Sequence, residues 1–300
     1  MLKSFFILWL VSFSLILSGC AGVPSSSARS QMGNLLLAEP LPASARSQMT
    51  IVRYNQILAQ APLQAQERAE LLYQRGMLYD SVGLSGLAQY DYNQALKLKP
   101  DMAEAYNSIG IHFTQQQEFI QAYEAFDSSL EIDPEFEFAF LNRGIALYYG
   151  GRPELAVQDL GAFLERNEND PYRALWAFIA EYELSPEQAT RHLREASTRL
   201  DPRNWATLLV ELYLDDISES ELLGALAIGV TNQRQLTDRL CEAYFYLGKY
   251  HAARGHRGRA SNYFKLALST NVYEYVEHRY ARLELNMLRE DVYKENQAQQ

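Results

Sequence analysis

Residues 69–102 read AELLYQRGMLYDSVGLSGLAQYDYNQALKLKPDM, and the same pattern returns in residues 103–136 and again in residues 137–170. Each copy carries a glycine, an alanine twelve residues later, and a tyrosine, phenylalanine or leucine sixteen residues later. In chain order these positions are Gly76, Ala88 and Tyr92; Gly110, Ala122 and Phe126; and Gly144, Ala156 and Leu160. A pattern that recurs every 34 residues predicts a stack of helix pairs, because one such unit cannot bury its apolar face alone.

The spacing resembles the tetratricopeptide-repeat pattern. We expect each glycine to meet the alanine of the second helix, and the aromatic positions to fill the space between neighbouring pairs. Gly248 restores the frame, with Ala260 twelve and Phe264 sixteen residues later, so residues 241–274 are expected to form a fourth repeat. The predicted fold class is all-α, a solenoid of such helix pairs with extra helices outside the frame.

Residues 51–290 are expected to form this solenoid, although its middle departs from the frame. Residues 171–240 keep a helical pattern in a divergent form, broken by prolines and acidic pairs. Residues 51–60 predict a first helix that could cap the solenoid or pair with a second copy of the chain. Residues 273–288 predict a last helix that could cap the other end or pack back into the groove. Residues 291–300 read as a polar tail.

The N-terminus reads as the export signal of a lipoprotein. A positive charge precedes a mostly apolar run over residues 5–17, and residues 17–20 read LSGC. This tetrapeptide resembles the bacterial lipobox, in which a peptidase cuts before the cysteine and the thiol then carries diacylglycerol. Residues 1–19 are therefore expected to be a signal peptide, and Cys20 to carry the acyl lipid. By the same resemblance, Ala21 favours the outer membrane, with the protein facing the periplasm.

Residues 20–50 are rich in serine and proline and show no helical period, so we expect a flexible, lipid-bearing linker. The hexapeptide SARSQM occurs twice in it, at residues 27–32 and 44–49. Drift in an unconstrained segment explains the duplication, and a docking motif is the alternative. A flexible chain of this length spans roughly 30 Å, which would hold the folded part clear of the lipid surface.

The acidic balance of the chain argues against a nucleic-acid partner. The formal net charge is −10, whereas a phosphate backbone is bound mainly through Lys and Arg side chains. One run within residues 249–259 opposes this balance. Its basic members are Lys249, His251, Arg254, His256, Arg257 and Arg259. We interpret the run as a solvated turn between two helices, with a contact to an acidic partner as the alternative.

No motif in the sequence predicts catalysis. The chain has no HExxH, GxSxG, Walker or CxxC sequence, and its five histidines lack the spacing of metal ligands. Glu277 and His278 invite an acid–base interpretation, but neighbouring residues of a helix point in different directions, so we expect a structural role for His278. Cys241 is expected to be a lone buried thiol. The sequence thus predicts a protein that is not an enzyme, with no metal and no cofactor beyond the lipid on Cys20.

The concave face of the stack is the candidate partner-binding site. By resemblance to other arrays of this kind, the first helix of each pair lines the groove, and each of the first three repeats contributes three side chains. They are Tyr73, Met77 and Asp80; Asn107, Ile111 and Thr114; and Leu141, Ile145 and Tyr148. This apolar and aromatic set suits an extended or helical peptide better than a clamp for a terminal carboxylate, which would need Lys and Arg. Alternatively, some of these residues touch the last helix.

Beyond the repeat architecture, the mature chain resembles the outer-membrane lipoprotein NlpI family of Gram-negative bacteria. Five segments carry much of the resemblance. They are GMLYDSVG at residues 76–83, AYEAFDS at 122–128, LNRGIALYYGGR at 141–152, FYLGKY at 245–250 and VEHRYA at 276–281. The longer linker, the divergent residues 186–240 and the basic turn at residues 254–259 depart from the family pattern.

This resemblance implies a homodimeric periplasmic adaptor that breaks no bond itself. Its partners would be a peptidoglycan endopeptidase of the NlpC/P60 class and the tail-specific protease Prc, which would degrade the endopeptidase that the adaptor presents. A wider role in coordinating cell-wall enzymes is also implied. Apolar residues expected to be exposed on the first helix give weak support to the dimer. The alternative function is a lipoprotein subunit of an outer-membrane assembly complex.

Overall fold

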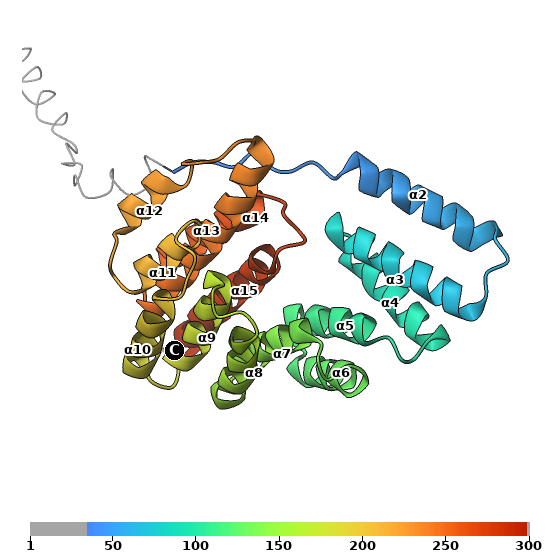
Figure 1. The fold of residues 1–300 in the computed structure, drawn as a ribbon, viewed down its shortest axis with the longest axis horizontal. Coiled ribbons are helices and arrows are strands. Elements are labelled where there is room, and N and C mark those ends of the chain that lie inside the picture. The colour runs from blue at the N-terminus through green and yellow to red at the C-terminus, as the bar shows by residue number, and fades with distance from the viewer. Residues whose placement is uncertain (1–34, 299–300) are drawn as a thin grey trace, which may run out of the picture. The chain divides into compact units, whose positions relative to one another are not determined.

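The computed structural model describes residues 35–298, and every regular element in that range is a helix (Figure 1). The predicted all-α class is therefore confirmed. The chain from Leu37 onward forms one compact unit that contains the described helices. The expected signal peptide, Cys20 and the first copy of SARSQM lie outside the described residues. Within the described range, no helix combines the length and hydropathy needed to cross a membrane.

The helices follow one another with short connections. In chain order they are α2 (Ala45–Gln60), α3 (Ala65–Ser81), α4 (Ser85–Leu98), α5 (Ala103–Gln115), α6 (Phe119–Ile132), α7 (Glu137–Tyr149), α8 (Pro153–Glu165), α9 (Pro171–Tyr182), α10 (Pro186–Ser197), α11 (Thr207–Tyr213), α12 (Glu219–Ala225), α13 (Gln233–Ala253), α14 (Arg257–Ser269) and α15 (Val276–Ala298). The four predicted repeats correspond to the packed pairs α3 with α4, α5 with α6, α7 with α8, and α13 with α14. Consecutive pairs also pack on one another from α4 to α9, as a solenoid requires.

Each repeat glycine lies against the side chain sixteen residues later. A Cβ atom added to Gly110 would lie 2.6 Å from the Phe126 ring, and one added to Gly248 would lie 2.5 Å from the Phe264 ring. Our expectation that the glycine meets the alanine was therefore wrong. The large side chain of the second helix crosses directly over the first helix, and only glycine leaves room for it. The large side chain thus packs within its own helix pair and also, as expected, against the next one, since Tyr92 packs with Ile109 and Phe126 with Ala146.

An ion pair with the same spacing stabilises two of the repeats. Arg75 of α3 donates to both carboxylate oxygens of Asp91 in α4, each at 2.7 Å. Arg143 of α7 does the same with Asp159 of α8, at 2.7 and 2.8 Å. Each is a bidentate guanidinium–carboxylate pair whose carboxylate is buried. Such a pair fixes the register of the second helix against the first. Repeat two has Ile109 and Ala125 at these positions, both buried.

The linker ends earlier than its composition predicts. Helix α2 begins at Ala45, inside the segment expected to be flexible, because Ser44 caps it by accepting from the Ser47 amide. The second copy of SARSQM is thus part of a helix start. The segment before it is also attached to the fold, since the Leu41 amide donates to the Thr270 carbonyl at 2.9 Å.

Two later boundaries also differ from the prediction. Helix α13 begins at Gln233, eight residues before the expected start of repeat four, because Asn232 accepts from the Gln235 amide and caps the helix there. Helix α15 continues to Ala298, through most of the segment expected to be a polar tail. Residues 289–298 contain neither glycine nor proline, so nothing in the sequence stops this helix.

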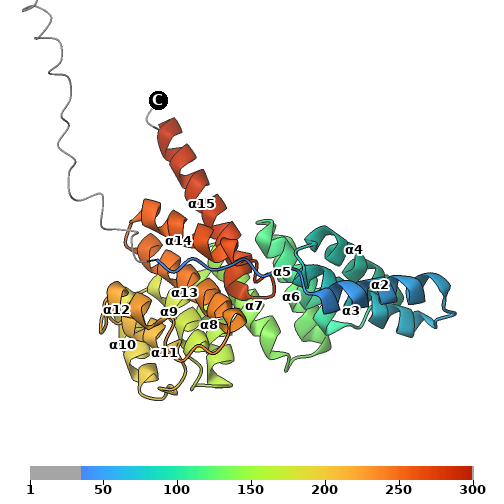
Figure 2. The same cartoon turned by 90° about the horizontal axis from the view of Figure 1, so that it is seen from above.

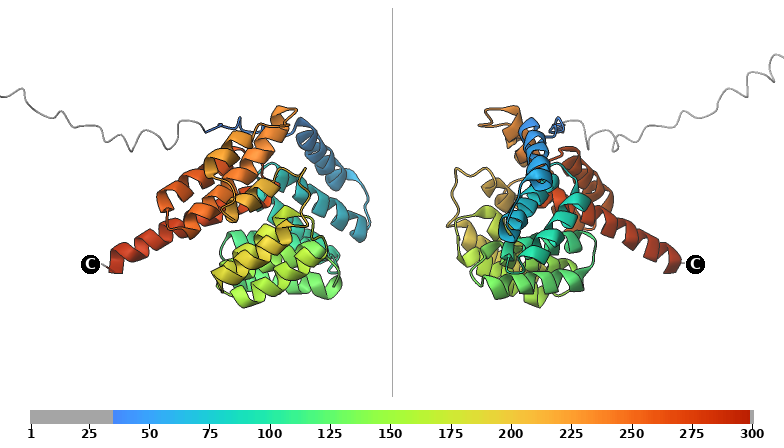
Figure 3. Two further views of the ribbon diagram at one scale, coloured as in Figure 1. Left: turned by 60° about the vertical axis from the view of Figure 1, so that its left-hand side comes forward. Right: turned by 90° about the vertical axis from the view of Figure 1, so that its right-hand side faces the viewer.

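The last helix lies in the groove, which decides between the two alternatives for its position. Helix α15 packs against α5, α13 and α14, and its first half is lined with buried side chains, among them Tyr280 and Leu283 (Figure 1). The later turns of α15 extend away from the other helices (Figures 2 and 3), and Tyr293 there is exposed. The concave face is therefore partly filled by the chain itself.

Candidate functional site

The concave face contains two cavities, and seven of the nine predicted groove residues line one or the other. Six line a first cavity of about 430 Å³. They are Tyr73, Met77, Asp80, Asn107, Ile111 and Leu141. Helix α15 supplies Val276 and Arg279 to the same cavity, a contribution that the repeat pattern did not predict.

Two predicted groove residues do not line a cavity, because they are buried beneath other helices. Thr114 is fully buried and donates to the Gly110 carbonyl within its own helix, and Ile145 is also fully buried. Helix α15 packs on α5, and the Tyr280 ring lies 5.5 Å from the ring of Tyr149 in α7. The alternative that some groove residues touch the last helix is therefore the better account of this part of the face.

Amide groups lie at the centre of the first cavity. The Asn142 side-chain NH₂ donates to the Asn107 carbonyl oxygen at 3.0 Å, joining neighbouring repeats. This bond leaves the Asn107 side-chain NH₂ and the Asn142 side-chain oxygen for other partners. One donor and one acceptor of this kind complement the carbonyl and N–H groups of a peptide backbone. Asp80 is already engaged, since it accepts from Tyr92 at 2.8 Å and contacts His112 at 3.0 Å.

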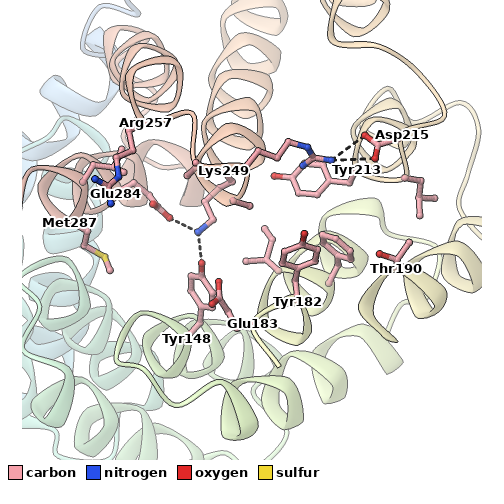
Figure 4. Close-up of a pocket in the computed structure, with 18 residues that line it drawn as sticks. Tyr148, Tyr182, Glu183, Thr190, Tyr213, Asp215, Lys249, Arg257, Glu284 and Met287 are labelled. Carbon is pink, nitrogen blue, oxygen red and sulfur yellow. Dashed lines mark hydrogen bonds and ion pairs between the residues drawn. The ribbon is translucent and has the colours of Figure 1, made fainter. Parts of the chain in front are cut away.

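Tyr148 lines the second cavity, of about 420 Å³, at the other end of the face (Figure 4). Its walls combine aromatic side chains, among them Phe178, Tyr182 and Tyr213, with charged side chains from α13 and the loops around it. Lys249 of α13 also lines this cavity, although the sequence placed this residue in a solvated turn. A cavity with aromatic walls and converging polar groups is typical of a binding site.

A buried ion pair forms the polar corner of this second cavity (Figure 4). The Lys249 Nζ lies 2.6 Å from Glu284 Oε1 and 2.7 Å from the Tyr148 hydroxyl, and Tyr149 donates to the same glutamate oxygen at 2.7 Å. Burial alone lowers the pKa of Lys249, but attraction to Glu284 and Tyr148 outweighs it and leaves the pKa above the ordinary lysine value. The ammonium therefore stays charged in the cavity.

The rest of the basic run is paired within the chain. His251 is buried, and its Nε2 lies 2.9 Å from Glu219, a carboxylate that also accepts from Tyr263. Arg254 lies 3.1 Å from Asp215 and stacks on the Tyr250 ring. The turn itself, residues 254–258, is exposed, in agreement with the solvated-turn interpretation, whereas Lys249 and His251 are buried in α13. The paired side chains connect α13 and α14 to the region around α12.

The other expectations of the sequence lie away from these cavities. Cys241 is buried with a free thiol, as predicted. His278 is buried, and its Nε2 contacts the Leu268 carbonyl at 3.2 Å, in agreement with a structural role. Among the described residues, no group of three or more His, Cys, Asp or Glu side chains is placed to hold a metal ion.

Comparison with known proteins decides the type of repeat. The tetratricopeptide-repeat family model matches residues 69–102, the first of the 34-residue units. Residues 69–102 are a tetratricopeptide repeat, and the all-helical chain has a solenoid fold of this type. Repeat proteins of this fold are typically non-catalytic scaffolds that bind peptides or partner proteins.

One solved structure resembles this chain in fold with a TM-score above 0.5, and two further matches have lower scores. A repeat protein from Parabacteroides merdae is 19% identical with a TM-score of 0.52, and the match covers 81% of this chain and 92% of that one. PilF of Pseudomonas aeruginosa is 16% identical with a TM-score of 0.45, covering 80% and 90%. YrrB, described as having an unusual peptide-binding site, is 17% identical with a TM-score of 0.42, covering 79% and 97%.

A third cavity, of about 280 Å³, contains two carboxylates that no cation neutralises by an ion pair in the described part of the chain. Burial raises the pKa of both Glu242 and Glu277, and the charge of Glu277 raises that of Glu242 further. A carboxyl group with a raised folded-state pKa stabilises the fold at low pH. That contribution disappears as the pH rises above about 4.5, where the unfolded carboxyl already ionises.

We therefore expect Glu277→Gln to gain stability relative to the native chain as the pH rises from 5 toward 8, by about 1–2 kcal/mol. Burial, with the nearby arginines, lowers the pKa of His278 to about 4, which costs stability as the pH falls below about 6.5. That effect is common to both proteins and cancels in their difference. Urea titrations of both at several pH values measure it, and a difference that is constant with pH would contradict the prediction.

Proposed function

We propose that this protein is a lipid-anchored adaptor of the periplasm that holds a peptidoglycan endopeptidase of the NlpC/P60 class and the tail-specific protease Prc together. The observation that carries the binding role is the concave face, where two cavities bring apolar, aromatic and amide side chains from several repeats onto one surface. The resemblance to the NlpI family supplies the identity of the partners. The adaptor presents the endopeptidase, and the protease degrades it.

The membrane location in this proposal comes from the sequence. The LSGC tetrapeptide supports a lipid on Cys20, and Ala21 supports retention at the outer membrane. Anchoring confines the adaptor and its partners to one surface. Two proteins held on one scaffold meet at a high effective concentration, so degradation accelerates without any new chemistry.

The proposal includes a homodimer. Met49 and Val52 of α2 are large apolar side chains exposed on the helix that precedes the first repeat. Burying them against a second copy would remove apolar surface from water, which is the main driving force of association.

Crosslinking in intact cells, followed by capture of the full chain from membranes, tests the proposed function. We expect both the endopeptidase and the protease to be recovered. Mixing the three purified proteins should accelerate loss of the endopeptidase by about tenfold or more over the protease alone, as expected for effective concentration. Capture of a β-barrel protein instead would support the outer-membrane assembly alternative. Cleavage of peptidoglycan by this protein alone would overturn the adaptor role.

A matched pair of variants in repeat one links that effect to the groove. Met77 lines the first cavity and is 49% exposed, whereas Leu87 of α4 is also 49% exposed but lines none of the cavities described here. Met77→Arg should weaken partner capture about tenfold, because it places a charge where an apolar side chain would pack. Leu87→Arg should leave capture unchanged. Equal effects of the two would show that partners bind elsewhere.

A further inference from the structure

A fourth cavity, of about 310 Å³, lies where α15 crosses the ends of the first two repeats. Its walls come from the turn between α3 and α4, the end of α5 and one face of α15. Arg279 and Arg282 both line it, three residues apart on α15 and therefore on the same side of that helix. The sequence singled out Asp80 and His278 in this lining for other reasons, but no sequence pattern assigned a role to Arg279 or Arg282.

The cavity carries an excess of positive charge in a chain whose net charge is −10. In the described part of the chain neither Arg279 nor Arg282 forms an ion pair, and Arg279 donates through Nε to the Tyr273 carbonyl at 3.2 Å. The carboxylate that lines this wall, Asp80, already binds Tyr92 and His112. Two guanidinium groups thus face one carboxylate that has other partners.

Two further features favour a negative charge in this cavity. Ser85, the first residue of α4, lines it, and no side chain caps that helix, so the N-terminal end of α4, where the helix dipole favours negative charge, lies at this cavity. His278 also lines it, and the two arginines contribute to the lowering of its pKa, after burial. The ring is therefore neutral near pH 7 and adds no charge of its own.

The cavity adjoins the first cavity of the groove. Asp80 and Arg279 line both. A peptide segment lying against the Asn107 and Asn142 amides would therefore pass Arg279 and reach Arg282. This adjacency identifies the source of the anion as a group on the bound segment itself.

We propose that Arg279 and Arg282 bind an acidic side chain of the partner segment that occupies the groove. A guanidinium group is planar and its N–H donors match the two oxygens of a carboxylate, so this pair selects segments in which an acidic residue neighbours an apolar or aromatic one. The inference rests on the proposed partner-binding function and adds a specificity rule to it. Because the site is open to solvent, the interaction weakens as salt rises.

Random dodecapeptides displayed on phage and selected on the full chain provide the probe. The selected sequences should be enriched in Asp or Glu. Fluorescence anisotropy then compares the best peptide with its Asn or Gln counterpart on the native protein, Arg282→Gln and Arg289→Gln. Arg289 is an exposed arginine on the same helix that lines none of these cavities, and serves as the matched control.

Loss of the acidic group should weaken binding to the native protein and to Arg289→Gln by about tenfold, and should have a clearly smaller effect on Arg282→Gln, which keeps only Arg279. A lysine peptide should gain affinity for Arg282→Glu. Selected peptides without a preference for Asp or Glu would overturn the carboxylate site and leave the groove proposal standing. The same holds if the peptide change and Arg282→Gln weaken binding independently, so that their losses of binding free energy simply add. A phosphoserine peptide that binds at least tenfold tighter than the aspartate one would also overturn it. Failure to select any peptide would overturn both proposals.

Discussion

Replacing Lys249 with methionine should lower the free energy of unfolding by about 3–5 kcal/mol. Lys249 and Glu284 are each only 8% exposed and lie 2.6 Å apart. Removing the ammonium leaves the Glu284 carboxylate in a medium of low dielectric, with the Tyr149 hydroxyl as its remaining described hydrogen-bond donor. The cost arises from this stranded charge, because a buried ion without its partner loses both hydration and attraction.

The companion variants separate that cause from lost packing. Glu284→Met should cost a similar amount, because it strands the ammonium. The double variant Lys249→Met/Glu284→Met should lose less than either single one, since it strands no charge and its methionines pack against the aromatic walls. Urea unfolding measures these free energies from the shift of the transition midpoint, provided that the dependence of the free energy on urea concentration (the m-value) is unchanged. Arg289→Met, an exposed change on the same helix, should stay within about 0.5 kcal/mol of the native protein. Losses that simply add would show that the two groups do not stabilise each other.

Gly110→Ala should destabilise the protein by about 1–3 kcal/mol, even though alanine is the better helix former. The added methyl group would lie 2.6–2.8 Å from three atoms of the Phe126 ring, and that ring is fully buried. The ring cannot move away without disturbing the next repeat, so the helices of repeat two must separate. This loss exceeds the gain of up to about 1 kcal/mol that alanine brings in a helix.

A glycine without neighbours provides the control. Gly161 lies inside α8, and a methyl group added there would have nothing within 4 Å, so Gly161→Ala should raise the free energy of unfolding by about 0.5–1 kcal/mol. In a Phe126→Leu background, Gly110→Ala should cost less than in the native protein, because leucine leaves more room. Urea unfolding followed by circular dichroism decides the outcome. A stabilising Gly110→Ala would show that the contact between the two helices can relax freely.

The candidate site was only partly predictable, and the reason is the last helix. The repeat frame correctly placed Tyr73, Met77 and Asn107 on a cavity, because positions within a repeat fix the face of its first helix. It failed for Thr114 and Ile145, which α15 and its neighbours cover. No spacing rule relates α15 to the repeats, so neither the two cavities nor the arginines of α15 could be read from the pattern.

Several features were determined by the sequence alone. Glycine and large side chains at a 34-residue period require stacked helix pairs, because one unit alone cannot bury its apolar face. The caps Ser44 and Asn232 set where α2 and α13 begin, although composition and repeat spacing did not reveal them. The tertiary structure decided what the concave face contains. Lys249 and Glu284 are 35 residues apart, and Tyr149 and Glu284 are 135 apart, so their meeting depends on how the last helix folds back. Lys249, which the sequence placed in a solvated turn, is instead buried and paired with Glu284. Once water is excluded, a charge loses its hydration and is stabilised mainly by its ion-pair partner.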